Sequence, residues 1–166
     1  MQRVIIPFLK IAILIMGLLA IVFGLIGLPQ LAEEAAKLNP EYAHFQYPVL
    51  IGIELTAIPF FIVLHQAFVL LKLIEKEAAF SASANDCLNK IKYCALFIVI
   101  MYTTGSLYLS IQSALHPGVA IIGVAIILIA LMISVFAVML QKLLARAIEM
   151  KVENKLTIEI VLDNAK

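Results

Sequence analysis

Apolar residues dominate four long stretches of the chain, and polar residues gather between these stretches and at the two ends. The stretches are residues 8–28, 48–71, 93–111 and 118–140. A helix rises 1.5 Å per residue, so about 20 residues cross the roughly 30 Å hydrocarbon core of a bilayer. Each stretch is long enough to span a membrane once. Transmembrane β-strands are excluded, because they alternate apolar and polar residues over about ten positions.

The composition indicates a membrane protein and excludes an ordinary soluble domain. Apolar residues make up 64% of the chain, charged residues make up 14%, and the mean hydropathy is +1.08. We therefore expect an all-α integral membrane four-helix bundle with short loops over residues 1–140, followed by a helical or extended tail over residues 141–166. The first span is too long for a cleavable signal peptide. The net charge of +1 does not favour direct nucleic-acid binding.

Lys and Arg residues are distributed unevenly between the two sides of the predicted bundle. Of the 12 Lys and Arg residues, Lys37 alone falls on one side. The others fall at the termini, in the loop between the second and third spans, or at the adjoining span ends. Short loops rich in Lys and Arg stay in the cytoplasm. We therefore predict a multi-pass protein of the bacterial cytoplasmic (inner) membrane with both termini in the cytoplasm.

Polar side chains within the spans are the first candidates for function, because hydrocarbon cannot satisfy them. Glu54 follows Pro48 by six residues, which places it about 9 Å below the outer end of the second span. Thr104 and Tyr108 in the third span come to a similar depth, since that span runs in the opposite direction. We expect a hydrogen bond from one of them to a protonated Glu54. Such a bond could join two helices, or Glu54 could bind a proton or a ligand.

Small residues in two spans indicate where helices pack closely. Ala20 and Gly24 stand four positions apart, as do Ala130 and Ser134, so the members of each pair share a helix face. This spacing predicts helix contacts within the bundle and leaves a homodimer open.

No catalytic or metal-binding motif accompanies these residues. His44, Glu41 and His116 on the outer loops are possible metal ligands, but they lack the spacing of a ligand pair. The chain shows no Ser/His/Asp set and no paired carboxylates. We therefore expect no enzymatic activity, no catalytic residue, no metal site and no cofactor.

The tail after the fourth span changes its period. Residues 141–152 keep helical spacing, and Asn154 is expected to end the helix. Beyond it, alternate residues are apolar: Leu156, Ile158, Ile160 and Leu162. This is the two-residue period of a strand. A single strand is not stable, so the segment is predicted either to be disordered or to pair with the sheet edge of a partner.

Several blocks of sequence carry a family resemblance. They are 47–52 (YPVLIG), 55–61 (LTAIPFF), 66–68 (QAF), 79–81 (AFS), 91–95 (IKYCA) and 138–144 (VMLQKLL). These blocks resemble a family of small four-span bacterial membrane proteins, domain of unknown function 2975. The resemblance spans about residues 45–157 and includes a tail block, 151–157, where Lys155 replaces an acidic residue.

The resemblance implies a cytosolic partner. Family members are often encoded beside a small Cro/CI-like helix-turn-helix regulator, and the family supplies no catalytic residues. The sequence therefore predicts a non-enzymatic regulatory or sensory protein. It would present its cytoplasmic loop and tail to a soluble partner such as that regulator. The alternative is a small oligomeric transporter or exporter that uses Glu54 as an intramembrane carboxylate. In both cases the spans lie in a lipid bilayer.

Overall fold

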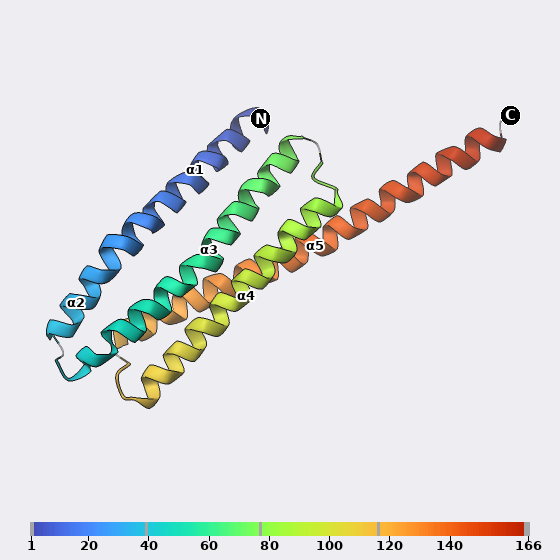
Figure 1. The fold of residues 1–166 in the computed structure, drawn as a ribbon. Helices are drawn as coiled ribbons and strands as arrows, with labels where there is room; N and C mark the ends of the chain where they lie inside the picture. Colours follow the sequence, from blue (N-terminus) through green and yellow to red (C-terminus); the bar gives the residue numbers. More distant parts are fainter. Residues whose placement is uncertain (1, 39, 77, 116, 165–166) are drawn as a thin grey trace.

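The computed structural model describes residues 2–38, 40–76, 78–115 and 117–164, and these residues form helices joined by short turns (Figure 1). The long helices are α1 (Gln2–Val22), α2 (Leu28–Leu38), α3 (Gln46–Glu75), α4 (Ala82–Ile111) and α5 (Pro117–Asn164). No strand occurs among the described residues. Four helical stretches are long and apolar enough to cross a membrane: Ile5–Glu34, Ala43–Glu75, Ala82–Ile111 and Pro117–Ile158. The predicted all-α membrane helical bundle is confirmed.

The first span continues past its predicted end at Leu28. A π-helical turn, Phe23–Gly27, joins α1 to α2, and the Leu28 amide donates to the carbonyl of Phe23, five residues earlier. The wider turn comes just before Pro29, which has no amide to continue the α-helical pattern. A Cβ atom on Gly27 would lie 2.7 Å from the Phe23 ring, so glycine lets this ring lie against the backbone. The chain therefore passes through Pro29 without leaving the helix.

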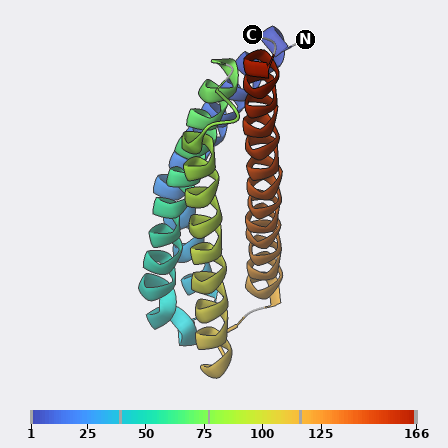
Figure 2. The same ribbon diagram turned by 90° about the vertical axis from the view of Figure 1, so that its right-hand side faces the viewer.

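The helices pack as a row rather than around a common centre. Among the described residues, α1 and α2 contact α3, α3 contacts α4, and α4 contacts α5, whereas α1 makes no substantial contact with α4 or α5. Figure 2 shows α5 as a separate column beside α4. Helices in lipid can associate this way, because hydrocarbon covers the apolar faces that water would drive together.

Two ends of the row differ in what they contain. Both termini and the connection from α3 to α4 lie at one end, which we call the N-terminal end (Figure 1). The opposite, distal end holds α2, the 3-10 turn Pro40–Phe45 and the connection from α4 to α5. At the N-terminal end, the Ser81 hydroxyl accepts a 3.3 Å hydrogen bond from the Ala84 amide and caps α4.

A cluster of buried apolar residues also lies at the N-terminal end. Ala84 and Leu88 of α4 are buried against Leu144 of α5. Partly buried leucines of α3, Leu70 and Leu73, pack on the same cluster. Three helices are therefore fixed to one another where α5 leaves the row.

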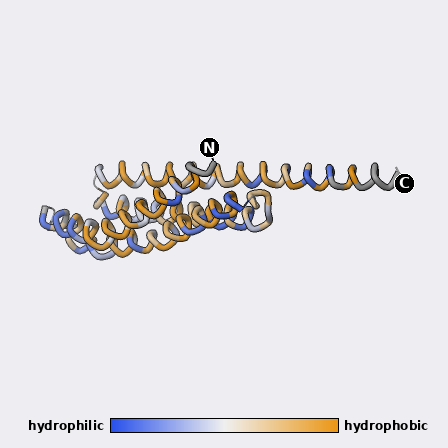
Figure 3. Tube along the Cα trace, turned by 90° about the horizontal axis from the view of Figure 1, so that it is seen from above, coloured by the Kyte–Doolittle hydropathy of each residue, from blue (hydrophilic) through white to orange (hydrophobic). Residues whose placement is uncertain are grey.

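The last part of α5, residues 149–164, extends beyond the other helices, and we call it the projecting segment (Figure 1). Hydrophilic positions appear along this part of α5, whereas the part beside the other helices is mostly hydrophobic (Figure 3). The predictions that Asn154 ends the helix and that a strand follows are both wrong, because α5 continues unbroken to Asn164. Extending an existing helix needs no new nucleus, and the segment has no Gly or Pro to stop it.

Candidate functional site

Glu54 lies on α3 within the candidate span Ala43–Glu75. It follows the start of that span by 11 residues and is about 7.5 Å from the span's midpoint at helical rise. Its side chain is exposed on the single chain and makes no hydrogen bond or ion pair with any described residue. A carboxyl group at this depth is therefore exposed and pairs with no described residue.

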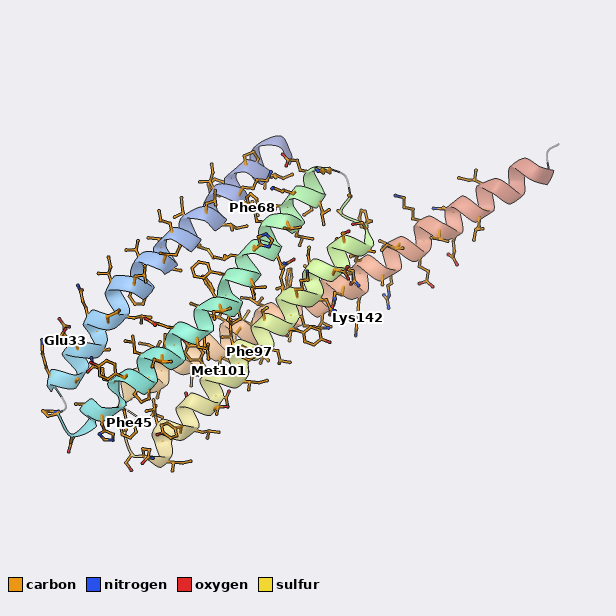
Figure 4. All side chains as sticks on the ribbon, viewed as in Figure 1. Glu33, Phe45, Phe68, Phe97, Met101 and Lys142 are labelled. Atoms are coloured by element: carbon orange, nitrogen blue, oxygen red, sulfur yellow. The ribbon has the colours of Figure 1, made fainter. Side chains whose placement is uncertain are left out.

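The other predicted intramembrane residues do not join Glu54 in a hydrogen-bonded group. The Thr104 hydroxyl donates to the Ile100 carbonyl of its own helix at 2.8 Å. Tyr108 is 50% exposed, and its ring meets Phe45 edge-on with 6.1 Å between the centroids. Phe45 lies at the distal end of the row, as Figure 4 shows. A functional role for Glu54, Thr104 and Tyr108 remains a prediction, and their expected hydrogen bond is not formed in this structure.

Buried polar groups occur instead at helix contacts. Thr56 and Gln66 of α3 are buried, as is Ser134 of α5. The Thr56 hydroxyl donates to the Ile53 carbonyl at 2.6 Å, which satisfies it within its helix. Ala130 and Ser134, one of the two small-residue pairs that the sequence indicated, are both buried, whereas a Cβ atom on Gly24 of the other pair would meet no atom within 4 Å. The helical spacing of Gln66 from buried Pro59 places both residues on one face of α3.

Polar contacts also hold the N-terminal end of the row together. The Gln141 amide of α5 donates to the Asn85 carbonyl and to the Asn89 side chain of α4, both at 3.4 Å. Lys10 of α1 forms an ion pair with Glu75 of α3 at 2.5 Å. The two Gln141 hydrogen bonds and the buried cluster around Leu144 fix α5 at the base of the projecting segment, whereas the ion pair ties α1 to α3.

The projecting segment exposes apolar side chains to its surroundings. Leu156 is 53% exposed and Ile158 is 59% exposed, and Met150 and Val152 are also exposed. Figure 4 shows that side chains leave this part of α5 in several directions, well beyond Lys142 at its base. The side chains of Ile160 and Leu162 lie outside the described residues. Leu156 and Ile158 therefore lie on the surface of a helix and not on the strand that the sequence predicted.

The other polar side chains of the described residues do not form a metal-binding cluster. Among the described residues, no group of three or more His, Cys, Asp or Glu side chains is placed to hold a metal ion, and His116 falls outside them. On α2, Lys37 pairs with Glu33 at 2.7 Å. The Glu33 carboxylate accepts a hydrogen bond from Lys37 and attracts its charge, which raises the pKa of Lys37. This pair is fully exposed and serves as an ordinary surface contact.

Comparisons with known proteins identify a family for the chain and a relative that is named as a membrane protein. The profile of a family described as "Protein of unknown function (DUF2975)" matches residues 30–158. The chain is 42% identical over 160 residues to the uncharacterized membrane protein YoaS of Bacillus subtilis (strain 168), covering 95% of this chain and all of the relative. No solved structure matches the chain. Nothing in these comparisons indicates an enzymatic activity.

Proposed function

This chain belongs to the DUF2975 family, and from that premise we propose that it is a non-enzymatic regulatory or sensory protein of the bacterial cytoplasmic membrane. In this proposal, a soluble partner binds the projecting segment of α5. The observation that carries it is the unbroken helix from the packed row into open space, with Leu156 and Ile158 exposed on it. Exposed apolar side chains on a projecting helix add little to the packing of the single chain. They are the kind of side chain that binds in a helix-binding groove of another protein.

The charge distribution supports a cytoplasmic position for this segment. Of the 12 Lys and Arg residues, Lys37 lies near the distal end, and the others lie toward the N-terminal end or in the tail. Because short basic loops remain in the cytoplasm, both termini are proposed to lie there. A small helix-turn-helix regulator, which the family resemblance suggests, is the partner to test first. Such a regulator would bind the projecting segment as a helix, and not as a strand added to one of the regulator's sheets.

Binding to the projecting segment is tested with full-length chain in lipid nanodiscs and a purified candidate regulator. Replacing Leu156 and Ile158 with Glu should weaken binding at least tenfold, since it removes the apolar contact. Asn154→Glu with Thr157→Glu is the matched control, because it adds the same charge to exposed polar positions and should bind nearly as well. Equal binding by all three forms, or by a chain lacking residues 154–166, would contradict the proposal.

Glu54, which pairs with no described residue, favours a second candidate function, a small transporter that works as an oligomer. Four helices alone rarely enclose a path for a solute, so several copies would be needed. Glu54 would then bind and release the coupling proton. Glu54→Gln should abolish proton-dependent uptake into vesicles that contain the protein. Uptake that is unchanged by this substitution would exclude Glu54 from coupling.

A further inference from the structure

The outward face of α4 changes from polar to apolar at Tyr93. The exposed residues of this face follow one another by three or four positions: Asp86, Lys90, Tyr93, Phe97 and Ile100. The opposite side of the helix, which includes Ala84, Leu88 and Ile91, is buried. Tyr93 lies 11 residues after the start of α4, so the polar part of the outward face is about 16 Å long. Hydrocarbon cannot satisfy the side chains of this part.

Helix α1 exposes apolar residues at the height where α4 is polar. Phe8 is 70% exposed and Ile11 is 56% exposed. They flank Lys10, which pairs with Glu75 at the end of α3. The turns of α3 just before Glu75 pack on the first two turns of α4 in the buried cluster of the N-terminal end (Figure 1). The apolar surface of α1 therefore begins about two helical turns, or about 11 Å, nearer to this end than that of α4.

A flat membrane surface at one height cannot suit both helices. Headgroups at the height of Phe8 would leave the polar face of α4 in hydrocarbon, and headgroups beside Tyr93 all round the protein would leave Phe8 and Ile11 in water. Tilting of the row and a thinner leaflet beside α4 each accommodate part of such a difference. In both cases the lipid headgroups next to α4 lie close to Tyr93.

Two lysine side chains lie beside Tyr93 at this depth. Lys90 is exposed about one turn before Tyr93, and the Nζ atom of Lys92 lies 4.6 Å from the centre of the Tyr93 ring. Neither lysine takes part in an ion pair between described residues. Asp86 is the acidic residue of the outward face, and it lies one turn beyond Lys90 on the side away from Tyr93. The two ammonium groups are therefore free to bind an anion at the membrane surface.

We propose that α4 binds the headgroups of anionic phospholipids through Lys90, Lys92 and Tyr93. The ammonium groups attract the lipid phosphate. A zwitterionic headgroup carries its own cation, which offsets this attraction, so the site favours a lipid such as phosphatidylglycerol. The Tyr93 ring lies at the lower edge of the site, since tyrosine settles between headgroups and acyl chains. The projecting segment takes no part, so this inference is independent of the proposed partner binding.

Tryptophan fluorescence in vesicles tests the lipid preference. The chain has no tryptophan, so Tyr93→Trp places a single reporter at the site. The vesicles contain phosphatidylcholine and phosphatidylglycerol, with bromine on the acyl chains of one lipid at a time. Bromine quenches the reporter, so the quenching shows which lipid lies beside it. We expect phosphatidylglycerol to bind at least threefold more strongly than phosphatidylcholine. Equal binding of the two lipids, or a preference for phosphatidylcholine, would overturn the proposal.

Removing the lysine charges tests which side chains bind the headgroup. In the Tyr93→Trp chain, Lys90→Gln with Lys92→Gln should abolish the preference for phosphatidylglycerol. Lys72→Gln with Lys76→Gln is the matched control, because it removes the same charge from exposed lysines near the end of α3 and should keep the preference. A preference that survives the loss of Lys90 and Lys92, or that the control also loses, would show that the site is wrong. Circular dichroism checks folding, and if a variant does not fold, the result from the chain with all its lysines decides.

Spin labels test the difference in height. Phe8→Cys and Asp86→Cys are labelled in a background where Cys87 and Cys94 are replaced by Ser. Oxygen collects in hydrocarbon and a nickel complex stays in water, so the ratio of their contacts with a label measures its depth. We expect this ratio of oxygen to nickel contacts to be at least threefold higher at position 8. Equal ratios would remove the premise that the headgroups lie deeper beside α4.

Discussion

At the scale of single residues, a few polar and small side chains determine where the helices begin and how closely they approach. Ser81 precedes α4 in an extended conformation, with φ −125° and ψ 159°, and its hydroxyl accepts the Ala84 amide. The same amide donates to the Ser81 carbonyl at 3.1 Å, so the hydroxyl gives this first-turn amide a second acceptor. Ala84 itself is 1% exposed and lies in the core cluster, so the cap also sets the position of a core residue.

Replacing Ser81 with Ala should lower the free energy of unfolding by about 1 kcal/mol, since the N-cap hydrogen bond is lost. Ser83→Ala is the control, because Ser83 is exposed within the first turn of α4 and makes no cap bond among the described residues. The measurement is thermal unfolding in mild detergent, followed by circular dichroism. Equal changes in the two variants would show that Ser81 is not the cap.

At the scale of helices, the contact between α4 and α5 depends on small residues of α5. Ala130 is 5% exposed, and Ser134 and Ala137 are also buried. Near the distal end, a Cβ atom added to Gly123 would lie 3.3 Å from the Ser106 hydroxyl oxygen, so glycine keeps the two backbones close. Close approach of this kind increases van der Waals contact, which holds helices together where water is absent.

Ala130→Leu should destabilise the protein by about 1–3 kcal/mol, because the larger side chain overfills the contact between α4 and α5. Ala125→Leu is the matched control, since Ala125 is exposed on the same helix and has room for the larger side chain. Both variants can be compared by their thermal unfolding midpoints in lipid nanodiscs. A control that unfolds as early as Ala130→Leu would refute the assigned contact.

At the scale of the whole molecule, four spans in a row place both chain ends on one side of a membrane. The row leaves large apolar areas on both of its faces, which fits a protein surrounded by lipid or by further copies. The side on which the termini lie follows from the basic residues and not from the packing.

An impermeant maleimide applied to intact cells should label Lys37→Cys but not Lys151→Cys. Both positions are exposed lysines on helices, so they differ in side rather than in access. Cys87 and Cys94 are replaced by Ser in both variants, and labelling after lysis provides the positive control. Labelling of Lys151→Cys on intact cells would reverse the proposed orientation.

The sequence predicted the four spans and one helix contact because both depend on local features. Span length and hydropathy are properties of continuous segments, and Ala130 with Ser134 marked a face that is buried. The tail was mispredicted because Leu156 and Ile158 fit a strand pattern as well as a helix already nucleated upstream. The surroundings of Glu54 could not be predicted, since depth along α3 does not determine which helix faces a side chain.

The unbroken course of α5 gives the molecule a mechanical property. No Gly or Pro interrupts α5 after Gly123, so the projecting segment behaves as a stiff arm whose fulcrum is the cluster around Leu144. Asn164 lies about 30 Å beyond Leu144 at helical rise, so a tilt of about 10° at the fulcrum moves the tip by about 5 Å. If the proposed partner binds the projecting segment, a small rearrangement of the cluster around Leu144 would move its binding surface by this distance.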